Sequence, residues 1–351
     1  MSWVADIARP EIVALKPYKH AAWEPELIRL HANEFPWRTP GDDSRAGLNR
    51  YPEPQPRALI ERLADLYATA PGRVLAARGS DEAIDLLIRT FCRPESDAIL
   101  ICPPTFGMYT VAAQIQGAQV LSVPLRAADG FALDEEAVLK AAAACVKLVF
   151  LCSPNNPTGN LLDSKAILRI AQKLAGRALV VVDEAYLEFA GAESLAKAIP
   201  RQSNLCVLRT LSKAHGLAGA RLGTLIADAE VIRLVRKVIP PYAITQLTVE
   251  AALRLLDPSG AAAREERLAM VRSERQRVSR ALSGLRSVVR VWPSAANFVL
   301  AEFRDPATAL SRARAAKFLV RDARGYPELS QALRITIGAS AQNTRLLQAW
   351  S

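Results

Sequence analysis

Between residues 74 and 240, short apolar runs alternate with longer stretches in which apolar residues recur every three or four positions. The short runs predict buried strands, at residues 74–78, 98–102, 119–123, 146–152, 178–182, 205–209 and 221–227. Stretches between them, such as 82–91 and the one that begins at residue 164, predict amphipathic helices. Such alternation is typical of an α/β domain with a mostly parallel sheet that helices cover on both faces.

The pattern changes near Pro240. Residues 260–282, rich in Glu and Arg, predict one long helix, and later apolar runs predict strands at 288–291, 297–301 and 333–337. We therefore expect a large domain at 48–240 and a smaller α+β domain at 241–351. Residues 1–47 show little periodicity and predict an arm that packs against another surface.

The composition is that of a globular protein: 50% of the 351 residues are hydrophobic and 23% are charged. No apolar run is long enough to cross a bilayer. The first ten residues lack the charged start and apolar core of a signal peptide, so we expect a cytoplasmic protein without membrane contact. The five cysteines show no metal-binding spacing, so we expect free thiols and no metal site.

The formal net charge of +10 raises the question of nucleic-acid binding. The arginines are scattered, however, without a basic tail or a basic stripe interleaved with aromatic residues. The densest group, at residues 264–280, alternates with Glu at helical spacing, which is typical of a helix face in solvent. The charge therefore favours a small anionic substrate over nucleic acid.

Asp183 and Lys213 are the first candidate site residues. Asp183 ends the apolar run 178–182, and Lys213 follows the run 205–209. Because open α/β sheets bind ligands at the carboxyl ends of their strands, both side chains are expected in one crevice. A buried carboxylate beside a lysine suits pyridoxal phosphate (PLP): the lysine forms a Schiff base and the aspartate keeps the pyridine nitrogen protonated. The pair alone also permits a structural ion pair between strand ends.

Other segments supply partners for the remaining polar groups of PLP. Gly79-Ser80-Asp81 begins a helix directly after a strand. The first N–H groups of this helix can form an anion site, although an ordinary capped helix start would have the same sequence. The loop Ser153–Gly159, with two prolines and a glycine, fixes a side-chain amide at a strand end, where it can donate to the ring oxygen. Tyr186 can donate to the same oxygen. Ser212 and Arg221 can contact the phosphate.

The strings Asn-Asn-Pro-Thr-Gly at 155–159, Asp-Glu-Ala-Tyr at 183–186 and Thr-Leu-Ser-Lys-Ala at 210–214 resemble those of PLP-dependent aminotransferases with the aspartate aminotransferase fold. Asn49–Pro52 and Leu333–Thr336 narrow the resemblance to the histidinol-phosphate aminotransferase family of class II. It extends from about Leu15 to the C-terminus and implies fold type I of the PLP-dependent transferases.

The resemblance implies a role for each matching residue. Lys213 would hold PLP and move the proton, with Asp183 and Tyr186 as its catalytic partners. The cofactor contacts would come from Ser80, Asp81, Phe106, Asn156, Asp183, Tyr186, Ser212, Lys213 and Arg221. Phe106 stands where the family usually has tyrosine, so it keeps the stacking but lacks a hydroxyl. Tyr51 would reach the PLP phosphate of a partner subunit, which implies a homodimer.

The substrate contacts that the resemblance implies are Tyr18, Asn33, Arg321 and Arg334. The implied reaction is transamination between histidinol phosphate and 2-oxoglutarate in histidine biosynthesis. Three alternatives stay open at this point: an aromatic amino acid aminotransferase, a threonine-phosphate decarboxylase, and a regulator of this fold without catalysis.

Overall fold

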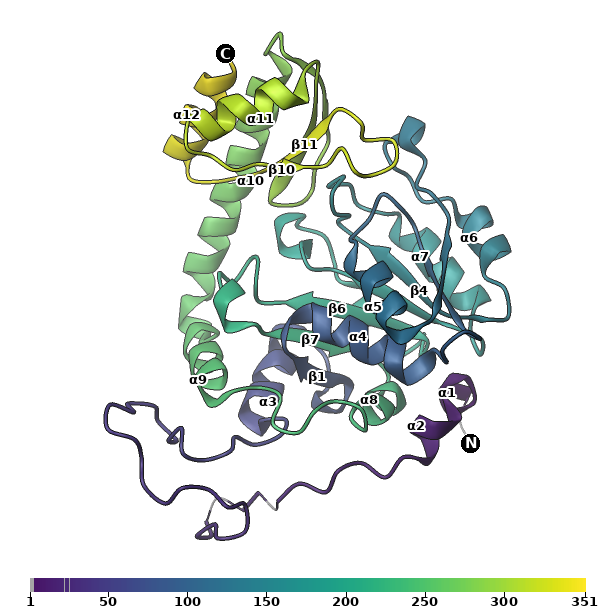
Figure 1. Cartoon of the computed structure of the whole chain (residues 1–351), viewed down its shortest axis with the longest axis vertical. Helices are drawn as coiled ribbons and strands as arrows, with labels where there is room; N and C mark the ends of the chain where they lie inside the picture. The colour runs from purple at the N-terminus through teal and green to yellow at the C-terminus, as the bar shows by residue number, and fades with distance from the viewer. Residues whose placement is uncertain (1–2, 22, 25) are drawn as a thin grey trace.

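The computed structural model describes residues 3–21, 23–24 and 26–351 and shows a large α/β domain with a smaller domain beside it (Figure 1). The large domain contains a seven-stranded sheet in the order β1-β7-β6-β5-β4-β2-β3. Its strands are β1 (Val74–Ala77), β2 (Ala98–Ile101), β3 (Gln119–Ser122), β4 (Val146–Cys152), β5 (Leu179–Asp183), β6 (Leu205–Thr210) and β7 (Gly223–Ile226). The predicted α/β fold is confirmed.

Most neighbouring strands of this sheet are parallel, from β3 through β2, β4 and β5 to β6. β7 is antiparallel to both of its neighbours, β6 and β1. The strand predicted at 221–227 begins later than expected, because Arg221 adopts a left-handed conformation (φ 52°) in the turn before Gly223. Arg221 is therefore a turn residue and not the first residue of a strand.

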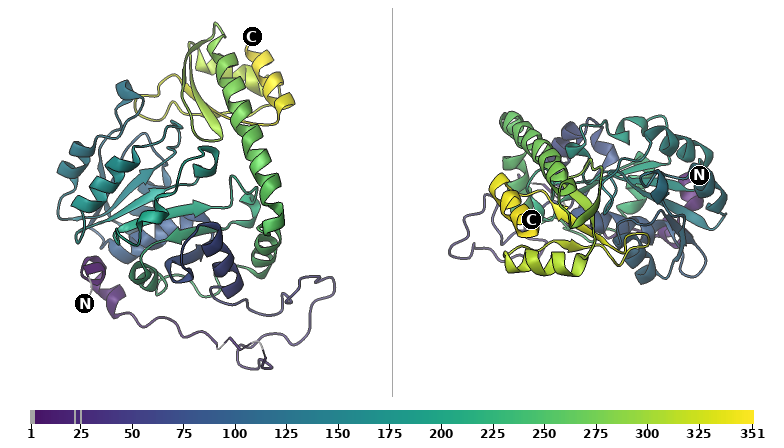
Figure 2. Two further views of the ribbon diagram at one scale, coloured as in Figure 1. Left: turned by 180° about the vertical axis from the view of Figure 1, so that it is seen from behind. Right: turned by 90° about the horizontal axis from the view of Figure 1, so that it is seen from above.

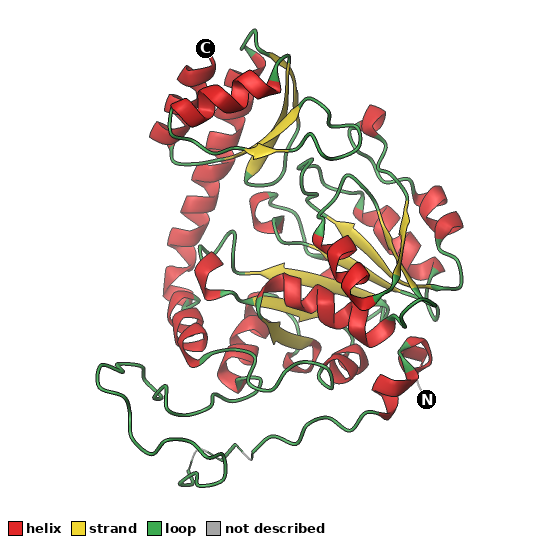
Figure 3. Ribbon diagram, in the orientation of Figure 1, coloured by secondary structure: helices red, strands yellow, loops and turns green. Residues whose placement is uncertain are grey.

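Helices cover both faces of the sheet (Figures 1 and 3). They are α3 (Arg57–Leu66), α4 (Gly79–Phe91), α5 (Met108–Gln116), α6 (Glu135–Ala141), α7 (Ser164–Lys173) and α8 (Ala229–Val235). Alternate residues of β5 enter different cores: Val180 packs in the core with α3, α6 and α7, and Val181 in the core with α4, α5 and α8. The unbroken apolar run of this strand follows from burial on both faces.

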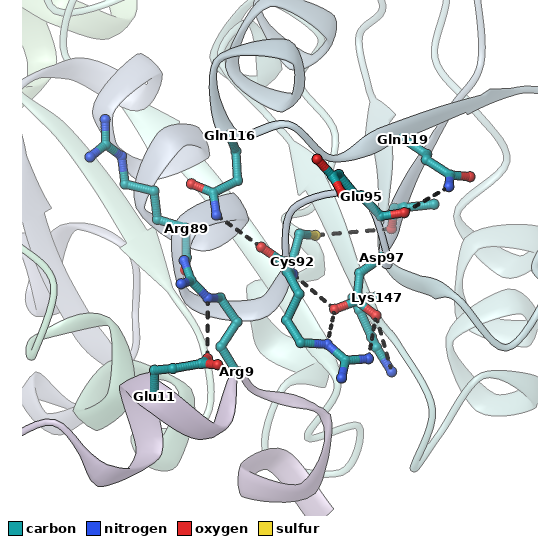
Figure 4. Close-up of polar contacts among 11 residues, drawn as sticks. Arg9, Glu11, Arg89, Cys92, Glu95, Asp97, Gln116, Gln119 and Lys147 are labelled. Atoms are coloured by element: carbon teal, nitrogen blue, oxygen red, sulfur yellow. Dashed lines mark hydrogen bonds and ion pairs between the residues drawn. The ribbon is translucent and has the colours of Figure 1, made fainter.

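Polar residues at the amino ends of the strands pair with one another (Figure 4). Asp97, just before β2, is 2% exposed and accepts hydrogen bonds from the backbone N–H (2.8 Å) and Nε (2.9 Å) of Arg93. Lys147 Nζ lies 4.0 Å from the same carboxylate. Burial raises the pKa of the neighbouring Cys92 to about 12, so it remains a thiol. These contacts stabilise the amino ends of the strands, whereas the candidate site residues lie at the carboxyl ends.

The small domain follows α9 (Gln246–Leu255) and the long helix α10 (Ala261–Ser283), which confirms the helix predicted at 260–282. Its antiparallel sheet has the order β10-β11-β9-β8. These strands are β8 (Val288–Trp292), β9 (Phe298–Phe303), β10 (Arg321–Asp322) and β11 (Ala332–Thr336). Helix α11 (Pro306–Ala315) lies between β9 and β10 in the chain, and α12 (Ser340–Trp350) follows β11. The predicted strands are present; β10 was missed because two residues give no period.

The N-terminal segment has two parts. Helices α1 (Trp3–Ile7) and α2 (Pro10–Ala14) come first, and Val4 and Ile7 are buried in the core beside α8. The chain then runs as an extended strip along the outside of the large domain (Figures 1 and 2). The strip 15–51, of which residues 15–21, 23–24 and 26–51 are described, carries strongly exposed apolar side chains such as Ile28 (87%) and Leu30 (89%).

Short 3₁₀ turns complete the secondary structure, at Pro71–Arg73, Ala127–Asp129, Leu187–Phe189, Leu195–Ala198, Ala218–Ala220 and Pro258–Gly260. Within the described residues, every helix is too short or too polar to span a membrane.

Candidate active site

An open cavity of about 510 Å³ lies where β4, β5 and β6 end. Its lining residues are Ser80, Asp81, Phe106, Cys152, Asn156, Asp183, Ala185, Tyr186, Thr210, Ser212, Lys213 and Arg221. Every residue predicted to contact the cofactor lines this cavity, except Tyr51. Residues up to 141 positions apart in the sequence, Ser80 and Arg221, therefore meet at one place.

Asp183 is the last residue of β5 and is 2% exposed. Its Oδ1 accepts a hydrogen bond from the backbone N–H of Ala185 (3.1 Å), and its Oδ2 accepts one from the hydroxyl of Tyr109 (2.8 Å). In the described part of the chain, no cationic side chain forms an ion pair with this carboxylate. Burial raises the pKa of Asp183 to about 6, so a cation bound beside this carboxylate would stabilise its ionised form.

Lys213 lies in the turn after β6, where the backbone N–H of Ser212 donates to Thr210 Oγ1 (3.1 Å). Lys213 Nζ is 5.8 Å from the ring centre of Tyr186. Partial burial, reinforced by the positive charge of Arg334, lowers the pKa of the Lys213 amine. A larger fraction of this amine is therefore neutral, the form that acts as a nucleophile or base.

The start of α4 forms an anion cradle. No side chain caps this helix, so its first N–H groups and its positive dipole end are left for a ligand. Gly79 has a φ of 79°, a left-handed conformation that favours glycine. A Cβ at Gly223 would overlap the backbone of Gly79 and Ser80, so glycine at this position lets β7 approach the start of α4. Arg221 Nη2 lies 3.1 Å from Asp81 Oδ2, beside the same helix start.

Hydrogen bonds hold the loop 153–159 in place. Asn155 donates to the carbonyl of Pro104 (2.8 Å) and to Thr158 Oγ1 (2.6 Å), and Thr105 donates to Asn155 Oδ1 (2.9 Å). The next residue, Asn156, accepts a hydrogen bond from Arg334 Nη1 on its side-chain oxygen. Its NH₂ group is consequently left as a donor at the cavity.

Arg334 and Arg321 lie directly opposite each other on β11 and β10. Directly opposed residues of an antiparallel pair share a face, and like charges in this arrangement are destabilising. Arg334 lies 5.2 Å from the ring centre of Phe298 and reaches the cavity through Asn156. Arg321 is exposed, and the role of the two arginines in binding the substrate stays a prediction.

The structure does not bring the arm residues to the cavity of their own chain. Tyr18, Asn33 and Tyr51 lie on the strip 15–51 and are exposed. Tyr51 stacks on Tyr242, with ring centres 4.7 Å apart. Their roles in binding substrate or the partner's cofactor stay predictions.

Several functional neighbours were missed from the sequence. Cys152, Ala185 and Thr210 line the cavity beside predicted residues. Tyr109 lies behind Asp183 and comes from α5, 74 residues earlier in the chain. No signal in the sequence indicated its role, since no local spacing links a helix residue to a distant strand end.

An α/β fold with a lysine and a buried carboxylate in one cavity at the strand ends is the arrangement expected of a PLP-dependent aminotransferase. Residues 27–349 match the family model of aminotransferase class I and II. The chain is 46% identical, over 353 residues, to histidinol-phosphate aminotransferase of Stenotrophomonas maltophilia, covering 99% of this chain and 96% of that relative. The chain thus belongs, within that class, to the histidinol-phosphate aminotransferase family.

Solved structures of related enzymes share the fold of this chain. Histidinol-phosphate aminotransferase from Sinorhizobium meliloti, in complex with pyridoxal-5'-phosphate, superimposes with a TM-score of 0.78 at 25% identity, covering 86% of this chain and 82% of that one. L-threonine-O-3-phosphate decarboxylase from Porphyromonas gingivalis gives a TM-score of 0.73 at 26% identity, covering 86% and 92%. The fold therefore accommodates more than one reaction on phosphorylated amino compounds.

Proposed function

We propose that this protein is a PLP-dependent histidinol-phosphate aminotransferase, which exchanges an amino group between histidinol phosphate and 2-oxoglutarate in histidine biosynthesis. The observation that carries the proposal is the single cavity in which Lys213, Asp183 and the uncapped start of α4 meet. Membership of the histidinol-phosphate aminotransferase family supports the substrate.

The residues of the cavity fit PLP in charge and order. The start of α4 with Ser80, Ser212 and Arg221 would hold the phosphate, and Asp183, a buried carboxylate without a cation, would hold the protonated pyridine nitrogen. Asn156 and Tyr186 would donate to the ring oxygen. PLP, when bound, supplies an electron sink that weakens the bonds at the α-carbon of an amino compound.

Lys213 is proposed as the residue that holds the cofactor and then moves the substrate's proton. Because burial lowers the pKa of the Lys213 amine, more of Nζ is neutral than in a free lysine, and in this form it can accept the proton from the substrate α-carbon and then return it as an acid. The face of Tyr186 and the backbone after β6 restrict where Nζ can move. This restriction positions the amine for repeated transfer.

Arg334 and Arg321 are proposed to bind the anionic end of the substrate. The opposed guanidinium groups suit a phosphate, or the carboxylates of glutamate and 2-oxoglutarate, because an anion between them relieves their repulsion. Tyr18 and Asn33 are proposed to complete this site. The net charge of +10 favours anionic substrates in general.

A homodimer in the cytoplasm is part of the proposal. The exposed apolar side chains of the strip 15–51 support a covering partner, and Tyr51 lies outside the cavity of its own chain. Tyr51 would then reach the phosphate site of the partner subunit.

A substrate comparison tests the proposal. The PLP-loaded enzyme is mixed separately with L-histidinol phosphate, L-phenylalanine and L-threonine phosphate, and the loss of the visible cofactor band is followed as the pyridoxamine form appears. Fast conversion with histidinol phosphate and slow conversion with phenylalanine is the expected result. The reverse preference would make the protein an aromatic aminotransferase, and release of carbon dioxide from threonine phosphate would make it a decarboxylase.

A further inference from the structure

Tyr109 stands directly behind the carboxylate of Asp183. Its side chain is fully buried, and its hydroxyl donates to Asp183 Oδ2 at 2.8 Å. The ring stacks on Phe150 (centres 4.8 Å apart, planes at 14°) and meets the edge of Phe106 at 5.7 Å. Packing on two aromatic neighbours fixes the ring, so the hydroxyl has a defined direction toward the carboxylate.

The hydroxyl remains a donor over the whole physiological range. Burial, and then the negative charge of Asp183, raises the pKa of Tyr109 well above its ordinary value. Burial also raises the pKa of Asp183, whereas the hydrogen bonds from Tyr109 and the Ala185 backbone N–H lower it. Tyr109 therefore makes the carboxylate a weaker base than its burial alone would make it.

The other titratable groups around Asp183 do not replace this effect. Asp81 and Glu184 carry negative charge and raise the pKa of Asp183. Cys152 remains a neutral thiol because burial raises its pKa strongly. Lys213 interacts with Asp183 electrostatically but forms no hydrogen bond with it in the structure described here. Tyr109 is thus the side chain that donates a hydrogen bond to this carboxylate.

The strength of the carboxylate as a base matters because it would share one proton with the pyridine nitrogen of PLP. If the carboxylate is the stronger base, the proton moves to oxygen and the ring loses its positive charge; if it is weaker, the proton stays on nitrogen. We propose that Tyr109 is a positioning residue that keeps this proton on the pyridine nitrogen by donating its hydroxyl hydrogen bond to Asp183. The inference rests on the proposed function in requiring PLP as cofactor.

The test compares Tyr109→Phe with Tyr67→Phe, loaded with PLP that carries ¹⁵N in the ring. Tyr109→Phe removes the hydroxyl and keeps the ring on Phe150. Tyr67→Phe is the matched control, since Tyr67 is equally a buried tyrosine but packs on the other face of the sheet, beneath the Arg209 guanidinium. The readout is the ¹⁵N chemical shift of the ring nitrogen, which needs neither substrate nor turnover.

The wild type and Tyr67→Phe are expected to show a protonated ring nitrogen, and Tyr109→Phe a shift displaced toward the neutral value. An unchanged shift in Tyr109→Phe, or a neutral ring nitrogen in the wild type, would overturn the inference. A second measurement uses the PLP-free protein: the pH at which Asp183 ionises in the folded state should rise in Tyr109→Phe above that of the wild type, and equal values would count against it. Failure of the proposed function is seen separately, as an absent half-reaction of the wild type with histidinol phosphate.

Discussion

At the scale of single residues, ionised Asp183 destabilises the PLP-free protein but is suited to bind the pyridinium nitrogen of PLP. Ionisation is unfavourable for a carboxylate that is 2% exposed and forms no ion pair with any described residue. A pyridinium cation would reverse this, because it supplies the missing charge. Stability of the PLP-free protein and affinity for PLP are therefore coupled through this one group.

The pH dependence of the PLP-free protein should reveal this cost. Asp183 has a folded pKa of about 6 against an ordinary value of 3.8. Because the folded pKa is raised, its stabilising contribution is complete below pH 3.8 and is lost as the pH rises through 6. Asp183→Asn does not titrate, so the wild type should lose about 2–3 kcal/mol of unfolding free energy relative to this variant between pH 4 and 7.5. Urea unfolding at both pH values measures this, and a constant difference would contradict it.

Lys213→Ala should remove the visible absorbance of bound PLP. Turnover should fall by at least about a thousandfold, because both the covalent attachment and the proton carrier are lost. Absorbance spectra and the half-reaction with histidinol phosphate measure the two effects. Lys197→Ala, an exposed lysine paired with Glu193, is the control and should keep both. Retained turnover in Lys213→Ala would refute the role of this residue.

At the scale of elements, the amino and carboxyl ends of the same strands serve different purposes. At the amino ends, Asp97 is bound by Arg93 and approached by Lys147, so its charge is satisfied within the chain. At the carboxyl ends, Asp183 is a buried carboxylate without an ion-pair partner among the described residues, and the first N–H groups of α4 are not capped by a side chain. The site therefore differs from the amino ends of the strands in that its carboxylate and its helix start lack such partners in the described part of the chain, not in the presence of charge alone.

The arginines of the small sheet should affect the substrate more than the cofactor. Arg334→Ala removes a guanidinium from the proposed anion site, and charge-assisted hydrogen bonds contribute about 1.5–3 kcal/mol, so KM for histidinol phosphate should rise by about tenfold to a hundredfold. The dissociation constant of PLP should change far less. Steady-state kinetics and PLP titration measure the two, and equal losses would show that Arg334 serves the cofactor instead.

The elements themselves were largely predictable. The apolar run before Asp183 allows burial on both faces only as a central strand, and the Glu- and Arg-rich stretch 260–282 has a helical period. The left-handed turn at Arg221 and the two-residue strand β10 were not predictable, because each depends on contacts with distant segments. Short elements carry too few residues for a period to be recognised.

At the scale of the whole molecule, the strip 15–51 is a segment whose large apolar side chains are left exposed by the rest of the chain. Its apolar side chains are exposed, and its Tyr51 stacks on Tyr242 without entering the cavity of the same chain. In the proposed homodimer, the second copy covers this surface and receives Tyr51, so the proposal predicts that a complete site requires assembly.

Mixing two inactive variants tests this link. Lys213→Ala and Tyr51→Ala are each expected to have low activity. If Tyr51 acts in the partner's site, a hybrid dimer contains one intact site, so random exchange should restore on the order of a quarter of the wild-type activity. Activity is measured before and after the subunits are exchanged in mild denaturant. No recovery, while a pull-down on an affinity tag carried by one variant shows hybrid dimers, would contradict the role of Tyr51 in the partner's site.

The sequence by itself determined the α/β class, the long helix and nine of the twelve residues that line the cavity, because strand periodicity and short motifs are local properties of the chain. The tertiary structure decided which distant groups meet. It placed Tyr109 behind Asp183, set Arg321 opposite Arg334, and joined Arg334 to Asn156. These contacts arise from how helices and strands pack across long separations, and no pattern within a short window of sequence encodes them.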